Sequence, residues 1–261
     1  MPVLRLTVAY DGTGLVGWQR QAEGVSVQGL LEDALGRLAG GAVQVHGSGR
    51  TDAGVHAAAQ VASATVETAL PMPVIRRALN AQLPPEVRVL DVAHAPAGFH
   101  ARYSARCKTY RYVIWSAPLI GPFAYRYAWH IPATLDLEAM QAAAAALPGR
   151  QDFSAFQSAG SEVADAVRTV TAAAVTAHAG QPATAIVPTI GMEAGGRLIV
   201  FEITADGFLR HMVRALAGLL VEIGAARRGS DSMASVLAGR DRGRAGPTAP
   251  AHGLWLMHVQ Y

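Results

Sequence analysis

The chain has 261 residues, 51% of them hydrophobic, and a formal net charge of +3 at pH 7, which suffices for a packed core and excludes a disordered chain. Its single cysteine, Cys107, excludes an internal disulfide and a multi-cysteine zinc site and favours the cytoplasm. The apolar runs stay below the eighteen or so residues of a membrane span, and the N-terminus has the pattern of a strand rather than of a signal peptide.

Residues 1–102 contain six predicted elements. Alternating apolar residues predict a strand over 3–10, and Ser26 is placed to cap a helix over 27–38. The remaining elements are two short strands, a helix opened by Pro73 and a last strand, at 42–46, 60–66, 73–82 and 87–94. Their order is β-α-β-β-α-β, that of a ferredoxin-like unit.

Residues 103–261 repeat this order. The predicted elements are a long strand, a helix, two strands, a helix and a final strand, at 103–115, 135–147, 168–178, 197–204, 208–224 and 253–261. The Pro/Gly-rich residues 179–196 predict a surface loop. We therefore expect an α+β protein of two similar halves, 1–102 and 103–261.

Three sequence features resemble ligand sites, but none has the context that such a site requires. Residues 12–17, "GTGLVG", match the dinucleotide-binding pattern, but the helix that should begin there starts only near Val27. A Walker A loop is excluded because the only lysine follows Cys107. His46 and His56 lack the close spacing of a metal pair, so no metal site is expected.

Residues 46–57, "HGSGRTDAGVHA", hold the densest cluster of glycine and polar residues in the chain. Three glycines surround Arg50 and Asp52, and they allow backbone conformations that other residues avoid. An aspartate in such a loop is usually a turn former that bonds its own backbone. The density exceeds what a turn requires, so a functional site is an equally good interpretation.

The same loop, "GSGRTDAGVHA", resembles a motif of the tRNA pseudouridine synthase A family, whose members modify the anticodon stem-loop. Five further segments resemble those of the family in the same order: "YDGTGLVGWQRQ", "FHARYSARCKTYRY", "GRQDFSAF", "DGFLRHMVR" and "RAGPTAPAHGLWL". Ser48 departs from the family, where alanine is common, and the segment 179–196 is longer than usual. The resemblance implies a pseudouridine-synthase fold, with a central, mainly antiparallel sheet and a cleft between the halves.

The resemblance also implies an activity. A homodimer would isomerise uridine to pseudouridine at positions 38, 39 and 40 of the anticodon stem-loop of tRNA. The bond from C1′ to N1 breaks, the uracil turns, and C5 joins C1′. Because nothing is oxidised and no group is imported, we expect no cofactor.

Four residues receive roles by the same resemblance. Asp52 is the catalytic residue, and an ionised carboxylate suits attack at C1′, attack at C6 or assistance to a glycal route. Arg50 would contact RNA phosphate or the flipped nucleotide, Tyr110 would stack on the target base, and Arg214 would pair with Asp52. The structural alternatives are an exposed loop arginine for Arg50 and a solvated helix face for Arg214. For His56, a hydrogen bond that anchors the loop is the better interpretation.

tRNA is the expected partner. Of 22 basic residues only Lys108 is a lysine, and arginine suits phosphate binding and base stacking, although a GC-rich genome produces the same bias. Further candidates for contact with the tRNA backbone are Gln19, Arg20, Arg76, Arg77, Arg227 and Arg228. Two other functions stay open: a tRNA-binding or tRNA-folding protein without catalysis, and a carboxylate hydrolase that acts on a nucleoside through Asp52 and His56.

Overall fold

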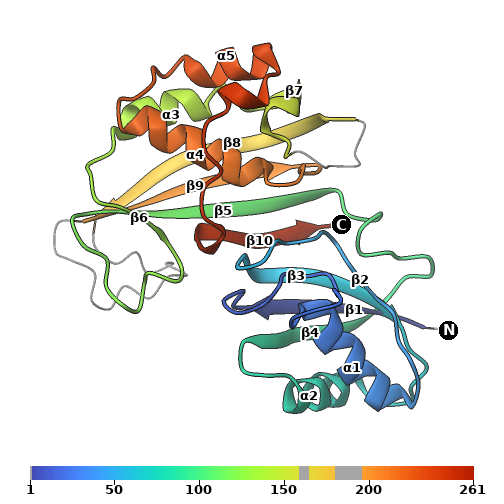
Figure 1. Ribbon diagram of the computed structural model, residues 1–261. Helices are drawn as coiled ribbons and strands as arrows, with labels where there is room; N and C mark the ends of the chain where they lie inside the picture. The colour runs from blue at the N-terminus through green and yellow to red at the C-terminus, as the bar shows by residue number, and fades with distance from the viewer. Residues whose placement is uncertain (1, 159–164, 180–195) are drawn as a thin grey trace. The chain divides into compact units, whose positions relative to one another are not determined.

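The computed structural model describes residues 2–158, 165–179 and 196–261 (Figure 1), so the predicted loop at 179–196 lies almost wholly outside the described residues. Within those ranges the protein is α+β, with five α-helices. The chain divides into two compact units, residues 1–108 with 255–261 (unit 1) and residues 109–254 (unit 2).

Unit 1 combines a four-stranded path with two helices. Its elements are β1 (Val3–Tyr10), α1 (Val27–Ala39), β2 (Val45–Gly47), β3 (His56–Thr65), α2 (Met72–Gln82), β4 (Val87–Ala95) and β10 (Leu254–Gln260). The strands run in the order β4-β1-β3-β10, and β2 also pairs with β3. All these pairs are antiparallel except β3 with β10, which are parallel. Figure 1 shows α1 and α2 on the same side of these strands.

Local sequence explains the first elements of unit 1. Every second residue of β1, beginning at Leu4, is buried, as the alternation predicts. The Ser26 side chain accepts a hydrogen bond from the Gly29 backbone N–H, which confirms the predicted cap of α1. At the other end of α1, Gly40 takes a left-handed conformation (φ 71°) and closes the helix.

Unit 2 has its helices on one side of a path of strands, in which β7, β8 and β9 pair antiparallel. Its elements are β5 (Cys107–Ser116), β6 (Trp129–Ile131), α3 (Leu137–Ala144), β7 (Gly149–Asp152), β8 (Val167–Ala179), β9 (Arg197–Ala205), α4 (Met212–Gly224) and α5 (Ser232–Gly239). The strand order is β5-β9-β8-β7, and β6 pairs in parallel with β5. In Figure 1, α3, α4 and α5 cover the same side of β8 and β9.

Several predicted boundaries are wrong. The predicted helix over 208–224 begins only at Met212, because His211 has a left-handed backbone (φ 62°) that no α-helix continues through. Arg210 and His211 therefore precede α4 instead of lying on it. The predicted strand from 103 begins at Cys107, since residues 100–104 form a hydrogen-bonded turn. The short elements β6, β7 and α5 were not predicted.

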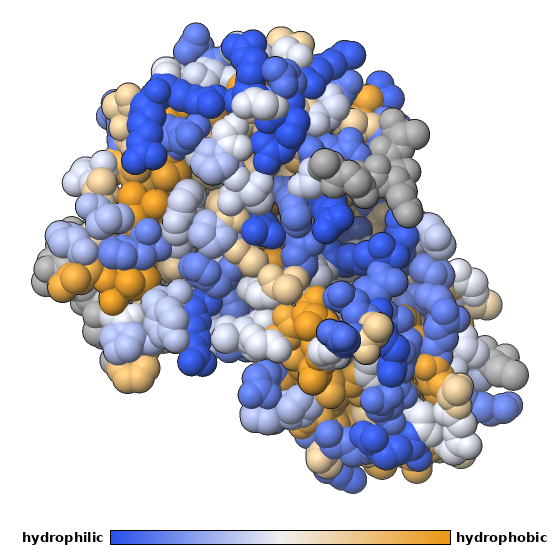
Figure 2. Space-filling model, in the orientation of Figure 1, coloured by the Kyte–Doolittle hydropathy of each residue, from blue (hydrophilic) through white to orange (hydrophobic). Residues whose placement is uncertain are grey.

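The surface is mixed in polarity. In the view of Figure 2, hydrophobic residues form separate patches among hydrophilic ones. In the part of the chain that the structure describes, no helix has the length and apolar character to cross a membrane.

Candidate active site

Residues 48–55 form the loop between β2 and β3, and hydrogen bonds fix where it begins. The backbone N–H of Ser48 donates to the Val61 carbonyl (2.8 Å). The Ser48 hydroxyl donates to Oε1 of Gln60 (2.5 Å), and Nε2 of Gln60 donates to the Gly49 carbonyl (3.0 Å). Ser48 and Gln60 are fully buried, so the serine that departs from the family's usual alanine is a structural part of the loop.

Thr51 anchors the middle of the loop. Its Oγ1 lies 2.8 Å from the Tyr10 hydroxyl, and both residues are buried. Burial raises the pKa of Tyr10 to about 12, so this hydroxyl stays protonated at neutral pH. Arg50 is exposed and Asp52 is half-buried. The loop thus buries the threonine and leaves its two charged neighbours accessible to a substrate.

The glycine-rich segment 12–18 braces the same loop from outside. A Cβ atom at Gly12 would lie 2.2 Å from the Val55 carbonyl oxygen, and one at Gly17 would lie 2.5 Å from the Thr51 carbonyl oxygen. The Trp18 backbone N–H donates to that Thr51 oxygen (3.0 Å). These glycines are therefore needed for close backbone packing, which explains the pattern without a bound dinucleotide.

His56 holds the end of the loop. Its ring is fully buried and stacks on Trp255, with centroids 4.4 Å apart. Nδ1 accepts a hydrogen bond from the Gly12 backbone N–H (3.0 Å), and the Asp11 carboxylate lies 3.1 Å from the same nitrogen. This burial supports the anchoring role and disfavours a hydrolase that works through His56.

In unit 2, Tyr110 lies on β5 with only 7% of its surface exposed. The Phe208 ring packs edge-on against it, with centroids 4.9 Å apart at 80°. Thr109 and Arg111 contact β9 instead, through Thr204 (2.8 Å between hydroxyls) and the Glu202 carboxylate (2.7 Å from the Arg111 guanidinium). Thr109 and Arg111 therefore bond to β9, whereas the Tyr110 ring between them packs against Phe208.

Arg214 lies in the first turn of α4 and is half-buried. Its Nε donates to the Ala249 carbonyl (2.7 Å), and the Ala249 N–H donates to the Arg214 carbonyl (3.0 Å). Nearby, the Pro250 carbonyl accepts a hydrogen bond from the Tyr112 hydroxyl (2.7 Å). Residues 247–250, which we call the strap, therefore orient Arg214, and the interpretation of a freely solvated helix face is wrong.

Two titratable groups near Arg214, Tyr112 and His252, are neutral at pH 7. Burial raises the pKa of Tyr112 well above its usual value, an effect that Arg214 partly offsets. Burial also lowers the pKa of His252, as does the charge of Arg214 to a smaller extent. The guanidinium is consequently the cation among these three groups.

The four predicted site residues fall into two pairs. Arg50 and Asp52 share one loop of unit 1, whereas Tyr110 and Arg214 belong to β5 and α4 of unit 2. The sequence did not identify Tyr10 and Gln60 as supports of the loop. Both residues lie in strands with ordinary apolar patterns, so only their long-range hydrogen bonds reveal them.

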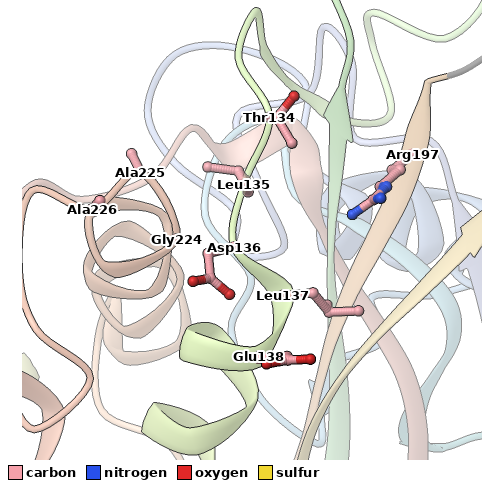
Figure 3. Close-up of a pocket in the computed structure, with 9 residues that line it drawn as sticks. All are labelled: Thr134, Leu135, Asp136, Leu137, Glu138, Arg197, Gly224, Ala225 and Ala226. Atoms are coloured by element: carbon pink, nitrogen blue, oxygen red, sulfur yellow. The ribbon is translucent and has the colours of Figure 1, made fainter.

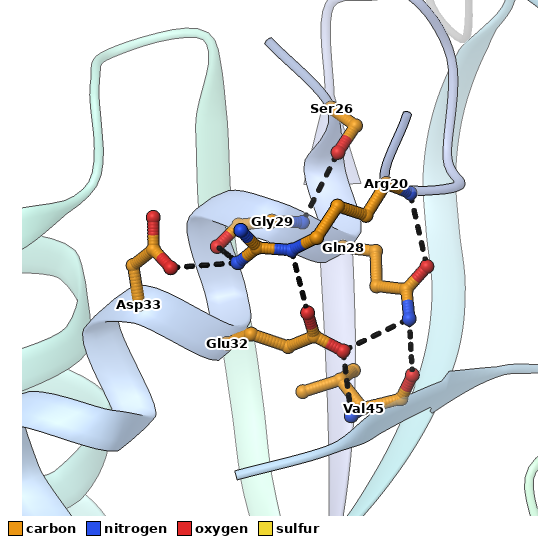
Figure 4. A network of polar contacts seen from close by, with 7 residues as sticks. All are labelled: Arg20, Ser26, Gln28, Gly29, Glu32, Asp33 and Val45. Carbon is orange, nitrogen blue, oxygen red and sulfur yellow. Dashed lines mark hydrogen bonds and ion pairs between the residues drawn. The ribbon is translucent and has the colours of Figure 1, made fainter. Parts of the chain in front are cut away.

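Arg20, a candidate for tRNA contact, is instead engaged within unit 1 (Figure 4). Its guanidinium donates to the carboxylates of Glu32 (2.9 Å) and Asp33 (2.6 Å) and to the Gly29 carbonyl (3.1 Å). The hydrogen bond to Asp33, which has the larger effect, and the one to Glu32 both raise the pKa of Arg20. Glu32 also accepts from the Val45 N–H (3.2 Å), so the cluster joins α1 to β2. A structural role is the better interpretation of Arg20.

A cavity of about 620 Å³ lies elsewhere in unit 2, where α3 begins and α4 ends (Figure 3). It is lined by Thr134, Leu135, Asp136, Leu137, Glu138, Arg197, Gly224, Ala225 and Ala226. Asp136 caps α3 by accepting from the Ala139 N–H. Because none of the four predicted site residues lines this cavity, it does not mark the candidate active site. Among the described residues, no cluster of His, Cys, Asp or Glu has the size of a metal site.

Comparison with known proteins gives one consistent match. A family described as tRNA pseudouridine synthase matches residues 6–104 and 143–261. The chain is 43% identical over 261 residues to tRNA pseudouridine synthase A of Syntrophotalea carbinolica, covering all of this chain and 97% of that protein. It is 40% identical to the enzyme of that name from Pelobacter propionicus and 43% identical to that from Moorella thermoacetica, over the whole of both chains in each case.

Proposed function

Because this chain belongs to the tRNA pseudouridine synthase family and isomerises uridine to pseudouridine in tRNA, we propose that its targets are uridines 38, 39 and 40 of the anticodon stem-loop. The observation that carries the proposal is the braced loop of unit 1. It buries Thr51 and presents Arg50 and Asp52 on either side. The whole-length similarity to proteins named tRNA pseudouridine synthase A supports tRNA as the substrate.

We assign the catalytic role to Asp52. The C1′–N1 bond breaks, a C1′–C5 bond forms, the proton leaves C5, and N1 of the product carries a proton. No atom is gained or lost, so the reaction needs no oxidant and no second substrate. An ionised carboxylate serves attack at C1′, attack at C6 and a glycal route alike.

The other three residues bind the substrate in this proposal. Arg50, exposed beside the buried Thr51, contacts RNA phosphate or the extruded nucleotide. Tyr110 stacks on the target base, and its fixed, buried ring loses little freedom when it does so. Arg214 contacts the substrate through its guanidinium, which the strap already holds in place.

Further parts of the proposal concern the assembly. The enzyme acts as a cytoplasmic homodimer without a cofactor, and its halves are ferredoxin-like. The element order β1-α1-β2-β3-α2-β4 over residues 3–95 supports the last point for the first half.

The test is pseudouridine mapping at single-nucleotide resolution. An unmodified tRNA with uridine at position 39 is incubated with the wild type, with Asp52→Asn or with Asp91→Asn. Asp91 is an exposed aspartate of β4 and serves as the matched control. We expect pseudouridine in the anticodon arm with the wild type and the control, and none with Asp52→Asn.

Two outcomes would overturn parts of the proposal. Pseudouridine only outside the anticodon arm would reject the target positions and keep the chemistry. Full activity of Asp52→Asn would reject the catalytic role of this residue.

A further inference from the structure

Four neighbouring side chains of unit 1 form a row of rings with one cation. The His46 and His100 rings lie 4.7 Å apart between centroids at 31°, and the His100 and Tyr103 rings lie 4.4 Å apart at 35°. The Arg102 guanidinium carbon lies 5.7 Å from the centre of the Tyr103 ring. We call His46, His100, Arg102 and Tyr103 the stacking platform.

The turn that carries this platform is preorganised. The His100 backbone N–H donates to the Ser104 hydroxyl (3.1 Å), and the Ser104 N–H donates back to the His100 carbonyl (2.9 Å). Nδ1 of His100 accepts from the backbone N–H groups of Arg102 (3.1 Å) and Tyr103 (3.4 Å), which fixes the plane of the ring. The row of rings therefore exists before any ligand arrives, and binding needs little ordering.

The same turn is anchored to the body of unit 1. Ala101 is fully buried; its N–H donates to the Ser63 hydroxyl of β3 (3.0 Å), and its carbonyl accepts from the Tyr261 hydroxyl (2.8 Å). The Phe99 ring packs on the Tyr261 ring, with centroids 4.9 Å apart. Arg102 and Tyr103, which follow directly, are exposed, and Tyr103 keeps 77% of its surface exposed.

Such an exposed ring contributes little to folding, because its apolar surface stays in water. Rings that stand free beside an arginine are instead suited to unpaired nucleobases, which stack on aromatic faces while the guanidinium binds phosphate. Burial lowers the pKa of His100, as do His46 and Arg102, so its ring is uncharged at neutral pH.

We propose that the stacking platform binds an unpaired nucleotide of the tRNA close to the target uridine. His46 belongs to β2, and the chain runs from it directly into the loop of Asp52, six residues later. Six residues span at most about 20 Å. Because nucleotides rise about 3.4 Å per strand in a stack, the bound nucleotide lies within roughly six positions of the target. Given the anticodon arm as substrate, on which this step rests, that nucleotide belongs to the anticodon loop.

Equilibrium binding of the unmodified tRNA tests the platform. Tyr103→Ala removes one stacking face, and we expect its Kd to rise roughly 5- to 150-fold at constant salt. Tyr103→Phe keeps the ring and should stay within about twofold of the wild type. Tyr125→Ala is the matched control, because Tyr125 is an exposed tyrosine that also has an arginine, Arg126, 5.5 Å from its ring centre.

The salt dependence of tRNA binding distinguishes the contribution of the Tyr103 ring from that of the Arg102 charge. Arg102→Gln should reduce the slope of log Kd against log salt by about one unit, whereas Tyr103→Ala should leave the slope unchanged. A direct readout is photo-crosslinking with tRNA that carries 5-iodouridine in the anticodon loop. We expect the adduct on the peptide that contains Tyr103.

Three results would contradict the proposed role of the stacking platform. They are an unchanged Kd for Tyr103→Ala, an equal rise in Kd for Tyr125→Ala, and a change in self-association on sedimentation without a change in Kd. The mapping of pseudouridine in the wild type decides the target positions separately. If the modification fell outside the anticodon arm, the Kd series would still accept or reject the platform as a tRNA-binding surface.

Discussion

Tyr10 shows how one buried hydroxyl supports the loop of Asp52. It contacts Thr51 at 2.8 Å and Gln60 at 3.4 Å, two residues that together hold the middle and the start of the loop. Tyr10→Phe keeps the ring but leaves the buried Thr51 hydroxyl without this partner. We expect a loss of roughly 1–2 kcal/mol in the free energy of unfolding and a lower rate of pseudouridine formation. Denaturant unfolding and the mapping assay measure both effects.

The pH dependence of the same variant has a definite sign. The pKa of Tyr10 is about 12 in the folded protein and about 10 in an unfolded chain, so the unfolded chain loses this proton first. The contribution is complete below pH 10 and is lost as the pH rises through 12. The stability advantage of the wild type over Tyr10→Phe should therefore be smaller at pH 11 than at pH 8, by on the order of 1 kcal/mol. An advantage that grew with pH would contradict this assignment.

At the scale of elements, the segment 12–18 acts as a brace. A Cβ at Gly12 would lie 2.2 Å from the Val55 carbonyl oxygen, and backbone cannot yield as a flexible side chain would. Gly12→Ala should reduce the free energy of unfolding by about 1–3 kcal/mol and slow pseudouridine formation. Gly41→Ala is the control, because a Cβ there meets no atom within 4 Å. Equal effects of the two substitutions would show that the loop does not depend on this packing.

A similar substitution tests the strap of unit 2. A Cβ at Gly218 of α4 would lie within 1.9 Å of the Pro247 carbonyl oxygen, so Gly218→Ala must displace the strap that orients Arg214. We expect a fall in the rate at saturating tRNA that resembles the effect of Arg214→Lys, which keeps the charge but loses the planar Nε donor. Single-turnover kinetics measure this rate. A Gly218→Ala enzyme with wild-type turnover would separate the strap from catalysis.

Local pattern explains which elements the sequence could predict. Alternation identified β1 with its observed bounds, and Ser26 identified the start of α1. The start of α4 was missed because the left-handed backbone of His211 has no local sequence cue comparable to a glycine. The motif drew attention to the loop of Asp52, but not to the residues that support it. Tyr10 lies 41 residues from Thr51 along the chain, and no local pattern encodes such a contact.

At the scale of the molecule, the end of the chain completes the first unit. Residues 255–261 belong to unit 1, although the 146 residues of unit 2 come before them. β10 pairs in parallel with β3, where Trp255 and Leu256 lie opposite His56 and Ala57. The loop of Asp52 therefore ends on β3, whose neighbour β10 is the last strand of the chain. The stability of this loop thus depends on residues from both unit 1 segments.

Trp255 is the residue through which this dependence can be measured. Its ring is 7% exposed and stacks on the buried His56 ring at 4.4 Å, and His56 in turn accepts the Gly12 N–H. Trp255→Ala should lower the free energy of unfolding by about 3–5 kcal/mol and reduce pseudouridine formation, because the end of the loop loses its support. Trp255→Phe keeps an aromatic face for His56 and should retain most of the activity. Calorimetry and the mapping assay on both variants test the link. If Trp255→Ala lost stability but kept full activity per folded molecule, the C-terminal strand would support the fold alone and not the geometry around Asp52.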